Sequence, residues 1–219
     1  VVPVINMAEK GYTGAAQITG PAGDLSQTSA VFQYTLGYDT DKYRVTLLFA
    51  NQGADPGVMQ RVPGVGSIAL IDMPAAGASG MVSGNSAAID YTRSLAIQRA
   101  VQNDAADINT FIDHTYKTLK IETPLISKTV PRIRVSDRSY IGAVQVAGPA
   151  DIVKRTRAVF EYNDTFDNGA FRVSILVPGD TEDPMNFHRV DNVGVTALVE
   201  TAANFPYQYY YLHDNGFDN

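Results

Sequence analysis

Three histidines are the first residues to weigh for chemistry, because imidazole binds metals and transfers protons near neutral pH. His114, His188 and His213 are far apart in the sequence. No two of them have the spacing of zinc ligands on one helix or strand. We therefore interpret all three as surface or interface side chains and expect no metal centre built on histidine.

Two pairs of aspartates could supply oxygen ligands for calcium. Asp39 and Asp41 form one pair, and Asp164 and Asp167 form the other. Neither pair belongs to the long, regularly spaced ligand set of an EF-hand loop, and aspartate is common in turns because its side chain accepts hydrogen bonds from the local backbone. We therefore expect turns here, and neither metal nor cofactor.

Nucleophiles and nucleotide motifs are scarce. The chain has no cysteine, and its Gly/Ser-rich strings do not form the Gly-x-Ser-x-Gly elbow of a serine nucleophile. No phosphate-binding loop or complete dinucleotide fingerprint is present. An enzyme would have to form its site between two parts of the chain, using His188, Asp183 and Glu182 as acid and base. We expect no catalytic residues and do not expect an enzyme.

The composition is mildly acidic and low in charge. The formal net charge is -6, and charged residues make up 18% of the 219 residues, against roughly 25% in ordinary soluble domains. A net negative chain is a poor non-specific ligand for phosphate backbones, so the charge does not indicate a nucleic-acid partner. No apolar run reaches the roughly 18 residues of a membrane-spanning helix.

The strongest signal in the sequence is an internal duplication. Residues 2–72 align with residues 130–200 without a gap, and about 27 of the 71 positions are identical. The shared stretches include a Gly-Pro-Ala string at 20–22 and 148–150, and Ala-Val-Phe at 30–32 and 158–160. We conclude that the chain contains the same unit twice, offset by 128 positions.

Each copy reads as antiparallel β structure, with runs of Val, Ile, Phe, Tyr and Thr between Gly, Pro, Asn and Asp clusters. A hairpin is predicted over residues 29–50 in copy one and 157–177 in copy two. A strand precedes it and ends at Gly-Pro, and another follows at 66–73 or 194–201. We predict four strands in each copy, or five if the Val-Pro opening also pairs.

These patterns divide the chain into four segments. Residues 1–74 and 130–202 are the two β copies. Residues 75–129 hold a Gly/Ala/Ser loop and one or two helices, one capped at Asn85-Ser86 and ending near Asn103, the other capped by Asp104 and ending near Leu119. The predicted fold class is α+β, mostly β, with this helical insertion between the copies. Residues 203–219 form a tyrosine-rich C-terminal arm.

Polar residues that recur in both copies suggest a role in the fold, because one catalytic site would need its residues only once. The simplest interpretation is an Arg–Asp pair that fixes a loop to a strand. By contrast, the basic cluster at 154–157 occurs in copy two alone, because it aligns with the neutral residues 26–29 of copy one. It could contact a phosphate or an acidic neighbour. The recurring residues are Arg44 and Arg172, Arg61 and Arg189, Asp39 and Asp167, and Asp55 and Asp183.

The C-terminal arm carries the residues that we expect at a subunit interface. Tyr207, Tyr209, Tyr210 and Tyr211 lie within five positions. Tyrosine combines a large contact area with a hydrogen-bonding tip and is enriched at protein interfaces. The alternative is that this segment is a last strand of the chain's own sheet.

These observations favour a structural subunit that assembles with copies of itself, such as a virion coat, decoration or tail protein or an extracellular filament subunit. A virion or extracellular assembly would be its location, and its partners would be copies of itself and other assembly proteins. The alternative is a lectin-like carbohydrate-binding module with two linked sites, for which the absence of tryptophan is a weakness. An enzyme with a site between the copies is the third hypothesis.

Overall fold

The computed structural model describes residues 1–40, 43–72, 91–121, 125–166 and 171–201. It is mostly β, as predicted, and each copy contributes five strands. The elements of copy one are β1 Val2–Asn6, β2 Gly11–Thr19, α1 Ala22–Gln27, β3 Ala30–Tyr38, β4 Tyr43–Asn51 and β5 Gly66–Asp72. Helix α2, Tyr91–Thr118, follows, and copy two comprises β6 Ile126–Arg134, β7 Tyr140–Gly148, α3 Ala150–Arg155, β8 Ala158–Phe166, β9 Phe171–Gly179 and β10 Gly194–Thr201.

The offset of 128 positions holds in the structure as well as in the sequence. Helix α3 and strands β8 and β9 begin and end 128 residues after α1, β3 and β4. The irregularity that shifts the register after Val4 in β1 recurs after Arg132 in β6. The two copies therefore share one fold, including its local irregularities.

Both copies contain one pair of parallel strands, which the predicted antiparallel pattern did not include. β1 pairs with β2 in an antiparallel hairpin, and β3 then lies parallel to β1 on its other edge. β6, β7 and β8 repeat this arrangement. The short helices α1 and α3, which the sequence pattern does not predict, turn the chain between β2 and β3 and between β7 and β8.

The ten strands form one closed ring in which the two copies exchange their last strands. The order is β1-β2-β5-β9-β8-β6-β7-β10-β4-β3. β5 thus lies between β2 of its own copy and β9 of copy two, while β10 lies between β7 and β4. A bridge between Ser67 and Val195 joins β5 to β10 and divides the ring into two lobes that share both strands.

The exchanged strands cross at two equivalent glycines. A Cβ placed on Gly66 would lie 2.5 Å from the Cα of Gly194, and a Cβ on Gly194 would lie 2.5 Å from the Cα of Gly66. The neighbours are backbone atoms that no side-chain rotation can move. Only glycine permits this approach.

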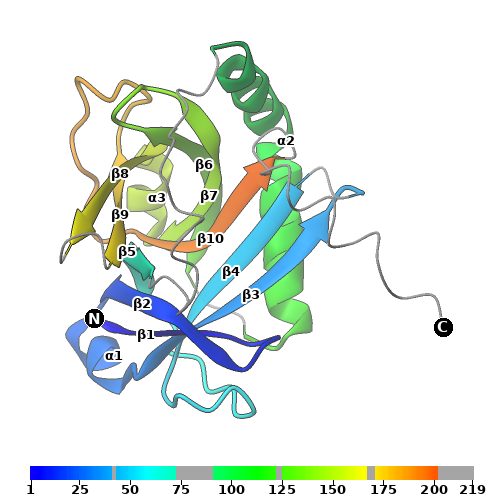
Figure 1. Cartoon of the computed structure of the whole chain (residues 1–219), viewed down its shortest axis with the longest axis vertical. Coiled ribbons are helices and arrows are strands. Elements are labelled where there is room, and N and C mark those ends of the chain that lie inside the picture. Colours follow the sequence, from blue (N-terminus) through cyan, green and yellow to red (C-terminus); the bar gives the residue numbers. More distant parts are fainter. Residues whose placement is uncertain (41–42, 73–90, 122–124, 167–170, 202–219) are drawn as a thin grey trace.

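Each lobe encloses its own apolar core. In lobe two, Val130, Val144, Val159 and Leu176 pack around Val153 of α3. Figure 1 shows the strands of copy two curled around this helix. In lobe one, Val4, Val31 and Leu48 face inward, and Leu25 of α1 packs under the neighbouring loop.

Helix α2 is one continuous element. The prediction that Asp104 would cap a second helix is wrong, because the helix passes through this position and the Asp104 carboxylate instead accepts a hydrogen bond from the Tyr43 hydroxyl. In the C-terminal half of α2, Ile108, Phe111, Ile112 and Leu119 recur at spacings of three and four, which predicts one apolar face. The structure confirms it: Ile108 and Ile112 are fully buried, and Phe111 and Leu119 pack beside them. No helix among the described residues is long and apolar enough to cross a membrane.

Candidate functional site

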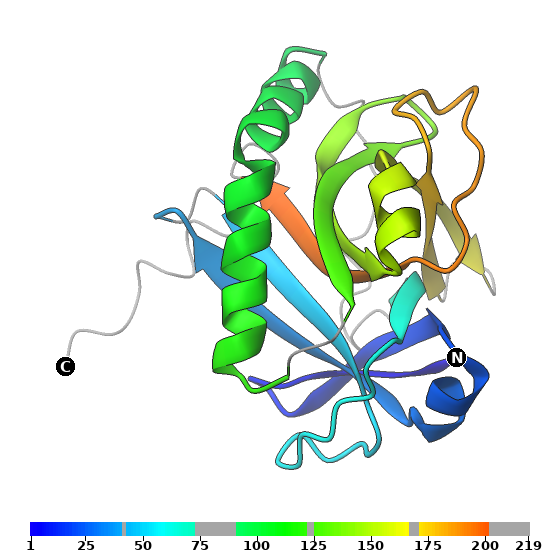
Figure 2. The same cartoon turned by 180° about the vertical axis from the view of Figure 1, so that it is seen from behind.

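The outer surface of β3, β4, β10, β7 and β6 carries helix α2, and we call it the helix face. Figure 2 shows α2 running across these strands. Its buried side chains pack against the largest core cluster of the molecule, which includes Phe32, Tyr43, Leu47 and Phe49 of copy one and Ala143 of copy two. Helix α2 therefore holds both copies together on one side of the ring.

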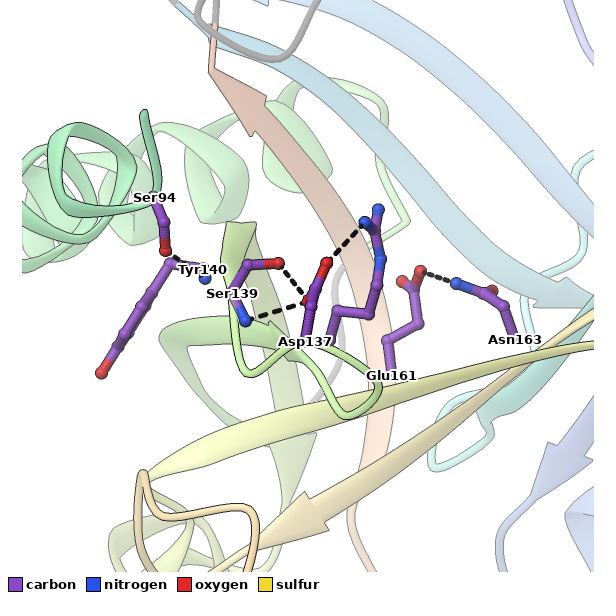
Figure 3. Close-up of polar contacts among 7 residues, drawn as sticks. Ser94, Asp137, Ser139, Tyr140, Glu161 and Asn163 are labelled. Carbon is purple, nitrogen blue, oxygen red and sulfur yellow. Dashed lines mark hydrogen bonds and ion pairs between the residues drawn. The ribbon is translucent and has the colours of Figure 1, made fainter. Parts of the chain in front are cut away.

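Polar contacts fix both ends of α2. Near its N-terminus, the Ser94 Oγ accepts a hydrogen bond from the backbone N–H of Tyr140 at 2.9 Å (Figure 3). The preceding turn is rigid because Asp137 accepts hydrogen bonds from the N–H and hydroxyl of Ser139. Burial opposes ionisation of Asp137, but these hydrogen bonds and the charge of Arg134 outweigh it and lower the pKa. Towards the C-terminus, the Tyr116 hydroxyl donates to the carbonyl oxygen of Thr196 at 2.6 Å.

A second polar group, around Glu161, lies in copy two alone. Arg132 and Glu161 form a buried ion pair at 3.4 Å. Glu161 also accepts a hydrogen bond from Asn163 at 2.8 Å (Figure 3). The equivalent residues in copy one are Val4 and Gln33. Because each of these charges already has a partner, we assign the group to the structure of lobe two.

The surface equivalent to the helix face is formed by β8, β9, β5, β2 and β1, and we call it the open face. No described helix covers it. On the helix face, Leu47 is fully buried, and Tyr34 and Tyr140 are partly buried in the α2 cluster. Their counterparts on the open face are Ile175, Tyr162 and Tyr12, which are 39%, 49% and 67% exposed. Tyr162 and Ile175 are direct cross-strand partners.

Some side chains that α2 covers on one side of the molecule therefore have exposed counterparts on the other, whereas Ile133 and Phe160, the counterparts of Ile5 and Phe32, are buried beside Phe187. A side chain such as Ile175 gains by leaving water, and contiguous exposed apolar surfaces commonly mark interaction sites. The open face is our candidate functional site.

The basic cluster singled out in the sequence lines a hollow of about 510 Å³ at the end of lobe two. Lys154, Arg155 and Arg157 face it, together with Arg189 and His188. Asp191 pairs with Arg189 at 2.9 Å, and Asp180 contacts the His188 ring at 3.2 Å. At four of these five positions copy one has the neutral residues Ser26, Gln27, Ser29 and Gln60, and only Arg189 has a basic counterpart, Arg61.

A smaller pocket of about 290 Å³ lies beneath the C-terminal half of α2. It is lined by Arg61, Asp113, Tyr116, Ser127, Gln145 and Thr196, among others. The Arg61 guanidinium carbon lies 4.7 Å from the centre of the Tyr116 ring, a cation–π contact. Gln145 donates to Asp113 at 2.8 Å and accepts from the Thr196 hydroxyl at the same distance.

The recurring charged residues have more than one role. Asp55 and Asp183 each accept a hydrogen bond from the backbone N–H two residues later, so their recurrence reflects a shared turn. The expected Arg–Asp pairing is wrong for Arg61, whose Nε and Nη1 have no hydrogen-bond partner among the described residues. Arg189, its equivalent, does pair with an aspartate.

The three acid–base candidates of the enzyme hypothesis lie in one loop but not around one cavity. His188 lines the basic hollow, whereas the described lining of that hollow includes neither Glu182 nor Asp183. Glu182 accepts a hydrogen bond from the Tyr140 hydroxyl at 2.7 Å, and Asp183 binds its own turn.

The remaining sequence candidates are scattered. His114 is exposed on α2, and Asp39 lies in the turn after β3. The turn expected at Asp164 is wrong, because β8 continues through this residue, which pairs with Val173. Within the described ranges, no group of three or more metal-binding side chains comes together. Asp41, Asp167, His213 and the four interface tyrosines Tyr207, Tyr209, Tyr210 and Tyr211 lie outside the described residues, as do the loop and cap predicted before α2.

Tyr116 should make the fold sensitive to alkaline pH. Burial raises its pKa from 10 to about 12, although the nearby Arg61 charge favours the tyrosinate. The unfolded chain ionises this group from about pH 10, whereas the folded chain resists, so its contribution is complete below pH 10 and is lost between pH 10 and 12. We expect this loss to reach roughly 2 to 3 kcal/mol.

Urea unfolding of wild type and Tyr116→Phe at pH 8 and pH 11.5 measures this effect. The stability advantage of wild type over the variant should shrink or reverse at the higher pH. The exposed Tyr12→Phe is the control and should show no such change. An equal difference at both pH values would contradict the assignment.

Comparison with known proteins identified no relative: no family model, curated protein or solved structure matches the chain.

Proposed function

We propose that this protein is a structural subunit that assembles with copies of itself, and that the open face is a contact surface in the assembly. The observation that carries the proposal is the exposure of Tyr12, Tyr162 and Ile175, whose counterparts are covered by α2. A coat, decoration or tail protein of a virion, or a subunit of an extracellular filament, fits this role. The proposal assigns binding, not catalysis, to the chain.

The occupant that we propose for the open face is the aromatic segment 205–211 of a neighbouring copy. Its tyrosines, Tyr207, Tyr209, Tyr210 and Tyr211, provide large apolar rings with polar tips, which suit a sheet surface that already exposes Tyr12 and Tyr162. On the helix face, an aromatic ring of the covering segment stacks on an arginine, as Tyr116 does on Arg61. Arg189 is the equivalent arginine for the open face, and its side chain is 60% exposed.

The position of the last described residue favours an arm from a neighbouring copy, rather than from the same chain, as the occupant of the open face. Thr201, the last described residue, pairs with Tyr43 of β4, on the helix face. The open face lies across the ring, on β9, β5 and β2. An arm that leaves from the helix face of one copy is well placed to reach the open face of another, a head-to-tail contact that propagates into a ring or filament.

The first test is the oligomeric state of the intact chain. Size-exclusion chromatography with light scattering and electron microscopy, over a range of concentrations, should show assemblies larger than the 23.7 kDa monomer. A chain that remains monomeric at high concentration would contradict the proposal.

Ile175→Lys tests the face itself. Placing a charge on the open face, next to Tyr162, should weaken association by about tenfold or more. Val58→Lys is the matched control, because Val58 is 49% exposed in a loop of lobe one, away from the open face. Both variants should keep the wild-type circular dichroism spectrum, since neither position is buried.

The arm is tested by replacing its four tyrosines with serine. Loss of association in this variant and in Ile175→Lys supports the proposed pair of surfaces. Mixing the two variants tests whether these two surfaces bind each other. Each variant retains one intact surface, so the mixture should form heterodimers but nothing larger. If Ile175→Lys assembles like wild type, the open face is not the contact.

A further inference from the structure

The pocket beneath α2 contains a buried positive charge that has no counter-charge among the described residues. The Nε and Nη1 atoms of Arg61 are inaccessible to solvent and have no hydrogen-bond partner. No carboxylate pairs with Arg61 in the part of the chain that the structure describes. Burial of the guanidinium lowers its pKa, and the main favourable contact is the face of the Tyr116 ring.

Such an arrangement is costly for a structural arginine. Withdrawing a cation from water carries a penalty of several kcal/mol unless an anion or a full set of hydrogen bonds offsets it. Nearly all buried polar groups in folded proteins have partners, so two unpartnered N–H groups at one side chain call for an explanation. An anion in the adjoining pocket, which Arg61 lines, would supply the missing counter-charge.

We infer that the pocket beneath α2 binds a small hydroxylated acid, with its carboxylate or phosphate on Arg61. The volume of about 290 Å³ is at the lower end for small-molecule sites, which limits the ligand to a compact molecule. A planar guanidinium presents paired N–H donors that match the oxygens of a carboxylate or phosphate group.

The rest of the lining determines what the ligand carries besides its charge. Asp113 accepts hydrogen bonds from Ser127 and Gln145, at 2.9 and 2.8 Å. Its carboxylate repels a second anion but accepts hydroxyl donors. A hydroxy acid satisfies both ends, because its charged group contacts Arg61 and its hydroxyls face Asp113, Ser127 and Gln145.

The duplication shows that this site belongs to one copy only. Arg189 occupies the position of Arg61 in copy two, but it pairs with Asp191 and its side chain is 60% exposed. Thr196 corresponds to Ile68, and the buried Gln145 corresponds to the exposed Gln17. Helix α2, which supplies Asp113 and Tyr116, completes the pocket on its own side alone.

The test is titration of the intact protein with gluconate, inorganic phosphate and acetate, and with glucose as the neutral control, at constant ionic strength. Calorimetry and thermal denaturation are the readouts. Gluconate should bind saturably and raise the melting temperature, and glucose should not. Phosphate and acetate show which oxyanion Arg61 prefers.

Variants decide whether Arg61 is responsible. Arg61→Gln should weaken gluconate binding at least tenfold, while Arg189→Gln, the equivalent change in copy two, should leave it unchanged. Arg61→Met should raise the melting temperature in anion-free buffer, because it removes an uncompensated charge, and should abolish the response to gluconate.

Two results would overturn the inference. One is that none of the three anions binds in a manner that depends on Arg61. The other is that Arg189→Gln reduces the response as much as Arg61→Gln, which would indicate general charge screening. Neither result bears on assembly through the open face, since Ile175 and the arm are not part of this pocket.

Discussion

Gly66→Ala and Gly194→Ala should each prevent the chain from reaching its native fold or destabilise it by more than about 4 kcal/mol. A methyl group at Gly66 would lie 2.5 Å from the Cα and 2.8 Å from the carbonyl carbon of Gly194. The reverse substitution meets the backbone of Gly66 at 2.5 to 3.0 Å. Relief would require β5 and β10 to separate, and both lobes depend on these strands.

Urea unfolding followed by circular dichroism measures this loss. Gly23→Ala is the control: it lies within α1, and a methyl group there has no neighbour within 4 Å. Because alanine favours helix, this control should leave stability unchanged or raise it by up to about 1 kcal/mol. Wild-type stability in Gly66→Ala would show that the strands do not cross so closely.

Cutting the chain between the copies should leave the two parts bound to each other but unable to fold alone. A protease site inserted between residues 73 and 90 separates β5 from α2 in sequence. β5 still pairs with β9, and β10 with β4, so the parts should co-elute after cleavage. Once separated in denaturant, each part lacks a strand that completes its lobe.

Refolding provides the readout for this second prediction. Each part alone should give little native circular dichroism or should associate with a second copy of itself, and mixing the two parts should restore the native spectrum. A separated N-terminal part that folds as a stable monomer would contradict strand exchange.

Much of the fold could be predicted from the sequence because the same apolar runs and turn residues occur at equivalent positions in both copies. The hairpins β3–β4 and β8–β9 lie where apolar runs flank turn residues. The apolar stripe of α2 was also readable from its spacing. Helices α1 and α3 could not be predicted because each has only six residues and begins directly after a proline, a residue that also ends strands.

The exchange of strands could not be predicted. Ala69 pairs with Ile175 of the other copy, and Ala197 pairs with Leu47 in the same way. Because these residue types would pair equally well within one copy, the sequence contains no signal for the choice. The helix cap expected at Asp104 was wrong for a related reason. The Asp104 carboxylate accepts a hydrogen bond from Tyr43, which is distant in the sequence.

The candidate site could not be predicted because equivalent residues of the two copies have the same type but different exposure. Tyr34 and Tyr162 are the same residue in equivalent strands, yet only Tyr34 packs in the cluster beneath α2. Which of the two is exposed depends on where the single helix lies. The sequence shows that Arg61 recurs as Arg189. Its contact with Tyr116 could not be predicted, because that contact depends on α2, which has no repeat in the described chain.

Because β5 and β10 each belong to both lobes, the two halves cannot accumulate sequence changes independently. A substitution in β5 changes its contacts with both β2 and β9, so it must be compatible with both lobes. The outer loops and the surfaces beside them carry no such double constraint. Among relatives of this protein, we therefore expect the shared strands to vary least and the two outer surfaces to diverge into different specialisations.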